Sequence, residues 1–124
     1  MLGRLFAPRQ TGDAAERVAE SYLAARGLTL VARNYRCRLG EIDLIMRERD
    51  TLVFVEVRLR RSAKDRDFGG AAASITAKKQ ARIIAAAQHY LAGMRELPPC
   101  RFDAVLMRGV AAGDIEWLTN AFEA

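Results

Sequence analysis

The sequence predicts a single α/β domain built on a central mixed sheet of about five strands. Three observations lead to this fold class. Apolar residues recur first at helical spacing, then at the alternating spacing of strands, then at helical spacing again and finally at strand spacing. The resulting order is one helix, three strands, a second helix and two strands. The length of 124 residues, 51% of them hydrophobic, suits one buried core.

The first predicted helix runs from Asp13 to Arg26 and stops at Gly27. We expect residues 1–11 to be a flexible leader and residues 12–124 to form the domain. The helix is amphipathic, and three of its residues fall on or near the buried side: Val18, Tyr22 and Leu23.

Two glutamates of this helix, Glu16 and Glu20, lie one turn apart. Either side chain could point toward the sheet, and a solvated helix face is the alternative for both.

Three strands are predicted next, over residues 28–36, 40–46 and 52–58. The break between the second and third is short enough for a hairpin. Because side chains alternate along a strand, Glu41 and Asp43 share one face of the second strand. By the same rule, Glu56 and Arg58 share one face of the third.

The register of this hairpin brings acids together. A four-residue loop over residues 48–51 would put Asp43 opposite Glu56 and Glu41 opposite Arg58. A shift of two residues would put Glu41 opposite Glu56 instead. Opposed carboxylates repel unless a cation lies between them, and magnesium is commonly held by one or two carboxylates, water and a substrate phosphate. The pattern therefore suggests a metal site for phosphate chemistry. The alternative is a structural Glu41–Arg58 ion pair, with Asp43 and Glu56 facing water.

A basic segment follows the third strand over residues 60–70 and ends in two glycines. It reads as an exposed loop that leaves the strand carrying Glu56. Three of its cations are candidates for contact with a nucleic-acid backbone: Arg60, Arg61 and Lys64. A merely solvated loop is the alternative.

The second helix is predicted to begin at a Ser74 or Thr76 cap and to end near Met94. Its first turns carry three cations: Lys78, Lys79 and Arg82. Cations near a helix start oppose the macrodipole, so an anionic partner such as a phosphate would explain their placement. A hydrated face on a helix held by packing would also account for them.

The last two strands are predicted over residues 102–107 and 115–118. Arg101 and Asp103 flank Phe102 on one side of the first of these strands. They could form an ion pair or support the acidic site. Trp117 is expected to pack in the core or on a face of the sheet.

The charge balance favours a polyanionic partner. The chain carries 20 Lys and Arg against 15 Asp and Glu, a net charge of +5 with a pI near 9.8. Such a surplus suits phosphate contacts, although mildly basic proteins are common. Nucleic acid is one partner of this kind, although the charge balance alone is weak evidence for it.

Other features limit the function and its location. No secretory signal core and no stretch long enough for a membrane span occurs. Cys37 and Cys100 lack a zinc spacing, which favours free thiols in a reducing cytoplasm. His89 is the sole histidine and sits in a helical pattern, so it is expected to be a helix surface or core residue and not a ligand.

The acid-bearing hairpin also carries a resemblance. The runs GEIDLI, residues 40–45, and FVEVRLR, residues 54–60, are similar to the PD-(D/E)xK nuclease signature, an Asp followed by Glu-x-Lys on the next strand. More narrowly, the chain resembles the YraN-type family of small bacterial proteins, which are similar to archaeal Holliday-junction resolvases. The similarity covers residues 12–122 and includes further positions: Gly12, Glu16, Ala19, Leu23, Gly27, residues 33–36, Lys78 and residues 101–103.

This resemblance implies a restriction-endonuclease-like fold and a nuclease site. It makes Asp43 and Glu56 the ligands of one or two Mg²⁺ or Mn²⁺ ions. Glu16 becomes an outer acid near the same site, and either Glu16 or Glu41 would supplement the ligands. The expected function is metal-dependent cleavage of branched or otherwise structured DNA, for which a homodimer would suit a symmetric junction.

Arg58 stands where the signature has lysine. Arginine can orient water and stabilise phosphate charge, but it stays protonated and cannot act as a base. Water would then have to be activated by the metal or by another group. Lys64 or Lys78 could supply an ammonium from elsewhere in the chain. A nucleic-acid-binding module that has lost turnover, and a protein-interaction domain with surface ion pairs only, are the alternatives.

Overall fold

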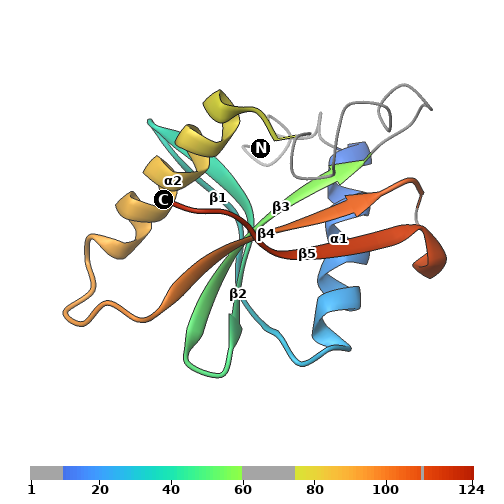
Figure 1. Cartoon of the computed structure of the whole chain (residues 1–124), viewed down its shortest axis with the longest axis horizontal. Coiled ribbons are helices and arrows are strands. Elements are labelled where there is room, and N and C mark those ends of the chain that lie inside the picture. Colours follow the sequence, from blue (N-terminus) through green and yellow to red (C-terminus); the bar gives the residue numbers. More distant parts are fainter. Residues whose placement is uncertain (1–9, 60–74, 110) are drawn as a thin grey trace, which may run out of the picture.

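The helices and strands follow one another in the predicted order of one helix, three strands, one helix and two strands (Figure 1). The structure, a computed structural model, describes residues 10–59, 75–109 and 111–124. Its elements are α1 (Gln10–Ala24), β1 (Thr29–Cys37), β2 (Gly40–Glu48), β3 (Thr51–Leu59), α2 (Ala77–Leu91), β4 (Cys100–Met107), the short 3-10 helix η4 (Ala112–Asp114) and β5 (Ile115–Phe122).

The five strands form one mixed sheet in the order β1-β2-β3-β4-β5. Strands β3 and β4 pair in parallel, and the other three pairings are antiparallel. A parallel pair needs a crossover connection, and α2 lies within the connection between these two strands. The predicted mixed sheet is confirmed.

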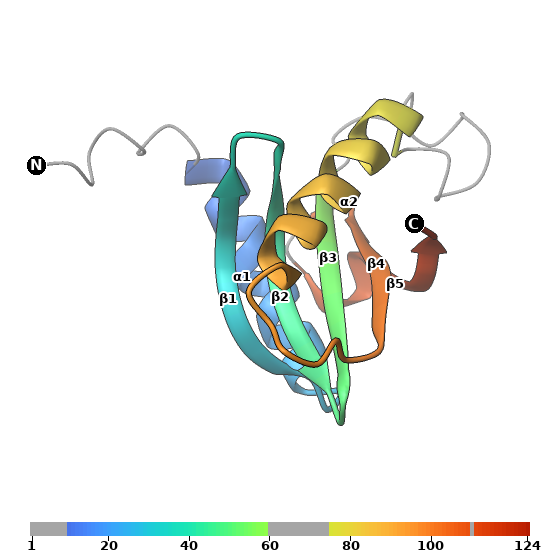
Figure 2. The ribbon, with the colours of Figure 1, turned by 90° about the vertical axis from the view of Figure 1, so that its left-hand side faces the viewer.

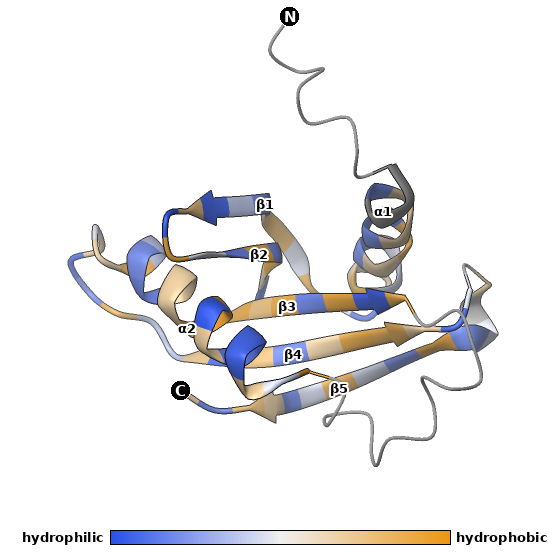
Figure 3. Cartoon of the chain, turned by 90° about the horizontal axis from the view of Figure 1, so that it is seen from above, coloured by the Kyte–Doolittle hydropathy of each residue, from blue (hydrophilic) through white to orange (hydrophobic). Residues whose placement is uncertain are grey.

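The two helices cover opposite faces of the sheet, with α2 in front of the strands and α1 behind them in Figure 2. Alternation along each strand therefore divides the apolar residues between two cores. On the α1 side Leu23 packs with sheet residues such as Leu44 and Val55. On the α2 side Ile83 packs with residues such as Phe54 and Phe102. Figure 3 shows the apolar residues running along the strands between the two helices.

Several element boundaries differ from the prediction. α1 begins at Gln10, inside the predicted leader, of which residues 1–9 lie outside the described part. β5 continues to Phe122, beyond the predicted end at 118, because backbone pairing extends past the apolar run. Thr76 is the cap of α2, since its side chain accepts a hydrogen bond from Lys79 N at 3.1 Å. No helix in the described part of the chain is long and apolar enough to cross a membrane.

The sheet forks between β2 and β3. Their ladder runs from Glu48↔Thr51 to Leu44↔Val55 and stops there, although both strands continue. Beyond that point β2 stays paired with β1, and β3 stays paired with β4. Figure 1 shows the β1–β2 hairpin leaving toward the upper left and β3 toward the upper right. We call the divergence point, marked by Asp43 and Glu56, the fork.

An irregular residue in β1 accompanies this divergence. Asn34 has a left-handed backbone, with φ of 51°. Arg33 before it bonds Glu20 of α1, whereas Tyr35 after it contacts His89 of α2. The two side chains thus reach opposite faces although a regular strand would put them on the same face. The change of face along β1 thus falls at this left-handed residue.

Gly40 holds the start of β2 against α2. A Cβ atom at this position would lie 2.1 Å from the carbonyl oxygen of Arg82 and 2.8 Å from its carbonyl carbon. Such distances are impossible for a side-chain atom, so only glycine permits this approach of the hairpin to the helix.

Candidate functional site

Asp43 and Glu56 lie together at the fork and are both buried, with 6% and 4% of their surfaces exposed. Val57 lies past the end of the β2–β3 backbone ladder. Its N–H donates instead to the side chain of Asp43, at 2.9 Å from Oδ2. The two carboxyl groups also share a hydrogen bond. The register predicted from the four-residue loop is confirmed at Arg47↔Leu52, and continuing it sets Asp43 opposite Glu56.

This arrangement changes the acidity of Glu56. Burial, and after it the charge of Asp43, raises the pKa of Glu56 to about 8, while the charges of Lys79 and Arg58 act in the opposite direction. A carboxyl group with such a pKa is largely protonated at neutral pH and can donate its proton to its neighbour. The pair therefore behaves as two acids that share one proton.

Two cations stand beside the pair. Lys79 Nζ, from the first turn of α2, lies 3.8 Å from Glu56 Oε2, and the Lys79 side chain is 30% exposed. Arg58 follows Glu56 by two residues on β3, is partly buried and lowers the Glu56 pKa by its charge. The fork thus combines two buried acids with an ammonium and a guanidinium.

The donor set at the fork fits a hard divalent cation. Two carboxylates from neighbouring strands supply oxygen ligands, and the charge of a cation between them would favour the ionised form of Glu56 against the burial and the Asp43 charge that raise its pKa. Across residues 10–59, 75–109 and 111–124, no three or more His, Cys, Asp or Glu side chains group as a metal site. Asp43 and Glu56 alone would therefore be the protein ligands, with water and phosphate oxygens completing the shell.

Glu16 is buried on α1, with 5% of its surface exposed, so the solvated alternative is wrong for this residue. It lines a small pocket of about 80 Å³ together with Arg33 and Asn34. The β1–β2 register places Asn34 opposite Asp43, so this pocket reaches the strand position beside the fork. Glu20, by contrast, forms a two-pronged pair with Arg33 at 2.8 and 3.1 Å.

Glu41 does not oppose Arg58, contrary to the predicted register. The β2–β3 ladder has ended before this position, and Glu41 pairs across β1 with Arg36, with 3.3 Å between their charged atoms. The fork turns β2 away from β3, which explains why a register extrapolated from the hairpin loop fails here. Glu41 is thus held against Arg36 of β1.

The predicted nucleic-acid-binding residues fall into two groups. Arg60, Arg61 and Lys64 lie outside the described residues. Lys78 and Arg82 are exposed on α2, on either side of the partly buried Lys79. Lys78, Lys79 and Arg82 therefore lie in the first turns of α2, whose start is beside Glu56.

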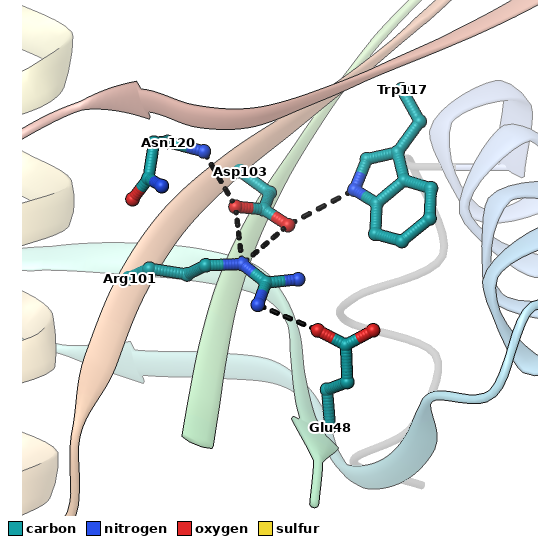
Figure 4. Close-up of polar contacts among 5 residues, drawn as sticks. All are labelled: Glu48, Arg101, Asp103, Trp117 and Asn120. Atoms are coloured by element: carbon teal, nitrogen blue, oxygen red, sulfur yellow. Dashed lines mark hydrogen bonds and ion pairs between the residues drawn. The ribbon is translucent and has the colours of Figure 1, made fainter.

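Arg101 and Asp103 form an ion pair away from the fork, on the α1 side of the sheet (Figure 4). Asp103 is fully buried and accepts hydrogen bonds from Arg101 Nε, from the Trp117 indole and from Asn120 N, at 3.0–3.2 Å. Arg101 also reaches Glu48 at 2.7 Å. These residues tie β2, β4 and β5 together, so their role in the described structure is structural.

The place of Lys79 beside the acid pair was not predicted, although the sequence held a signal for it. In α2 the buried residues are Ile83, Ala86 and Ala87. Lys79 precedes Ile83 by four residues and so continues this buried stripe, whereas Lys78 lies off it. Glu16 continues the α1 stripe of Ala19 and Leu23 in the same way. Lys79 and Glu16 thus share one sequence signal: each is a charged residue on the apolar stripe of its helix.

The comparisons with known proteins agree with the predicted family. The family described as "Uncharacterised protein family UPF0102" matches residues 15–107. A UPF0102 protein of Nitrosomonas europaea is 62% identical over 112 residues, which cover 90% of this chain and 92% of that protein. A UPF0102 protein of Nitrosospira multiformis is 57% identical over 115 residues, 93% of this chain and 94% of the relative. The chain therefore belongs to the UPF0102 family, the YraN-type family suggested by its acid-bearing hairpin.

Proposed function

We propose that this chain is a divalent-metal-dependent endonuclease that acts on branched or otherwise structured DNA. The observation that carries the proposal is the buried carboxyl pair of Asp43 and Glu56 at the fork, flanked by Lys79 and Arg58. Burying two acids side by side is costly for the fold, because burial and the charge of Asp43 both disfavour the ionised form of Glu56, and a bound cation would offset that cost. The resemblance of the hairpin to the PD-(D/E)xK signature and to resolvases agrees with this reading.

Each side chain at the fork has a role in this proposal. Asp43 and Glu56 hold Mg²⁺ or Mn²⁺, and such an ion, when bound, lowers the pKa of water and neutralises phosphate charge. The Val57 N–H fixes the orientation of Asp43. Arg58 and Lys79 hold the phosphate and balance the charge that develops on it. The exposed cations Lys78 and Arg82 continue the contact along the DNA backbone.

Lys79 replaces the ammonium that β3 lacks. Arg58 supplies charge and a planar set of donors but cannot accept a proton. Lys79 approaches the same pair from α2, and its position on the helix stripe keeps it partly desolvated. Of the two lysines considered from the sequence, Lys78 is exposed and Lys64 lies outside the described residues.

Cleavage assays test the proposal directly. With duplex, flap and four-way junction DNA and either Mg²⁺ or Mn²⁺, the parent protein is expected to cut at least one branched substrate. Asp43→Asn and Glu56→Gln should each lower the rate by about a hundredfold or more, as expected for loss of one ligand of a catalytic ion. Asp50→Asn, the same change in the exposed β2–β3 turn, should cleave at the parent rate. No cleavage by the parent with any substrate and either metal would refute catalysis.

A binding module without turnover is the second candidate, and Arg58 is the observation that favours it. In that case the parent binds DNA without cutting, and Arg58→Lys gains metal-dependent cleavage. If Arg58→Lys is as inactive as the parent while DNA binding persists, the missing lysine is not what prevents turnover.

A further inference from the structure

The tip of the β1–β2 hairpin presents an apolar side chain that its turn does not require. Cys37 pairs with Gly40, so Arg38 and Leu39 form a two-residue loop. Such loops favour glycine or asparagine with positive φ. Arg38 and Leu39 are of neither type, and neither of them is among the described residues with positive φ. Leu39 is nevertheless 58% exposed, at a position where local geometry gives no reason for an apolar residue.

A pocket lies between this tip and α2. It measures about 340 Å³ and is lined by Arg38, Leu39 and His89. Gly40 brings the tip into backbone contact with Arg82 of the helix, and Figure 3 shows the turn beside α2. The pocket is therefore built by two elements that glycine packing holds together.

The imidazole ring of His89 is fixed in this pocket. Its Nδ1 shares a hydrogen bond with the Tyr35 hydroxyl. Tyr35 packs edge-on against Tyr90, with ring centroids 5.2 Å apart, and Tyr90 packs edge-on against the buried Phe54. The ring is thus supported by the α2-side core, while the His89 residue itself stays exposed.

We propose that this pocket receives an unstacked nucleobase of the DNA bound at the fork. The inference rests on the proposed function and names its substrate class: DNA with unpaired bases next to a duplex. Leu39 supplies an apolar wall and His89 a planar ring, the two kinds of surface on which unstacked bases pack. Arg38, which lines the pocket, and the exposed Arg82 of α2 supply positive charge for the adjoining phosphates.

The spacing from the fork suits such a contact. Lys79, beside Glu56, and His89 are ten residues apart on one helix, about 15 Å at 1.5 Å per residue. This length corresponds to roughly four nucleotides of one stacked strand. The exposed cation Arg82 lies between them on α2. A strand cut at the fork can therefore place a base several nucleotides away in the pocket.

Binding measurements without divalent metal separate this inference from catalysis. Fluorescence anisotropy in EDTA would compare flap DNA, with unpaired bases, and a linear duplex of equal length. Leu39→Ala and His89→Ala are expected to reduce the preference for flap DNA roughly tenfold, within the range of losing one stacked base, and to leave duplex binding unchanged. Leu97→Ala, at the other large hydrophobic exposed in the described chain (69%), should bind as the parent does. A 2-aminopurine placed at the unpaired position should lose its quenching in the two pocket variants only.

The outcomes separate the two proposals. Unchanged flap preference in Leu39→Ala and His89→Ala overturns the base pocket, whether or not the parent cleaves DNA. Flap preference that depends on Leu39 in a protein that never cleaves supports the pocket and refutes only the endonuclease. If Leu39→Ala alters the oligomeric state in sedimentation and not DNA binding, the tip is a contact between copies of the chain and the base pocket is refuted.

Discussion

Glu56 determines the charge state of the fork, because it is the acid whose pKa is displaced most clearly. Burial and the neighbouring Asp43 favour its protonated form, and only part of this effect is offset by Lys79 and Arg58. Under the proposed function, a divalent cation and a proton would compete for this pair of carboxyl groups. We expect the metal-free protein to hold a proton there at neutral pH and to release it when a cation binds.

The raised pKa of Glu56 predicts how the stability of the metal-free protein depends on pH. The folded pKa of Glu56, about 8, lies above its ordinary value of 4.5. The unfolded state thus loses its proton first, and the free energy of unfolding should fall by a few kcal/mol as the pH rises from about 5 to 8. Glu56→Gln, which keeps a neutral side chain at every pH, should remove most of this decline. Urea unfolding in EDTA at about pH 5 and pH 8 measures it.

Two comparisons secure the assignment to Glu56. Glu116→Gln, at an exposed glutamate on β5, should show the same decline as the parent. Adding Mg²⁺ or Mn²⁺ at about pH 8 should restore stability in the parent and not in Asp43→Asn, since a ligand that binds only the folded state stabilises it. A parent protein whose stability is flat between about pH 5 and 8 in EDTA would contradict the shared-proton description.

Among the elements, the β1–β2 hairpin decides the geometry of the fork. Its strand β2 pairs with β3 only from Leu44 onward. The residues of β2 before Leu44 bend with β1 toward α2, where Gly40 meets the backbone of Arg82. Contact with the helix fixes the direction of the first residues of β2, and Asp43 lies three residues beyond Gly40. Close packing of this hairpin on α2 therefore also positions Asp43 relative to Lys79, which comes from the same helix.

Gly40→Ala should disturb this packing. A methyl group 2.1 Å from a carbonyl oxygen cannot be accommodated without moving the hairpin from the helix. We expect a loss of about 1–3 kcal/mol in the free energy of unfolding, as for overpacking in a close-packed interior. Gly93→Ala, where a Cβ would meet no atom within 4 Å, provides the matched control and should change stability by less than about 0.5 kcal/mol. Equal effects of the two substitutions in thermal unfolding would refute a tight hairpin–helix contact.

The elements and the fork were predictable from the sequence to different degrees. Periodicity gave the element order because it depends on local spacing. The sequence left two hairpin registers open, and the ladder follows the one that, when continued, sets Asp43 opposite Glu56. The pairing of Glu41 with Arg36 was not predictable in this way, since it depends on where β2 parts from β3. That point faces the left-handed Asn34 of β1, and the hairpin beyond it lies against α2 through Gly40, a contact that depends on tertiary packing. Element ends shifted for a similar reason: backbone pairing extends beyond the apolar pattern.

At the scale of the whole molecule, buried acids serve two different purposes. Asp103 on the α1 side has every carboxylate oxygen paired, through Arg101, Trp117 and Asn120 (Figure 4). Such a satisfied buried network holds β2, β4 and β5 in one arrangement. Asp43, at the other end of β2, lies against a second acid. The fold thus has a fully paired aspartate in one cluster and, at the fork, an acid pair in which Glu56 stays protonated, which is where the proposed cation would bind.

The same substitution at the two aspartates should separate these purposes. Asp103→Asn removes the buried counter-charge of Arg101, and we expect a loss on the order of 3 kcal/mol in the free energy of unfolding. Asp43→Asn keeps an oxygen for the Val57 N–H and removes the charge that, after burial, raises the pKa of Glu56, so its stability should change by less than about 1 kcal/mol. Urea unfolding at about pH 7 in EDTA measures both, and DNA cleavage measured on the folded fraction should show the reverse order, with activity lost only in Asp43→Asn. If Asp43→Asn is the more destabilising of the two, the acid pair is a structural element of the core. The assignment of a structural role to Asp103 and a functional role to Asp43 is then wrong.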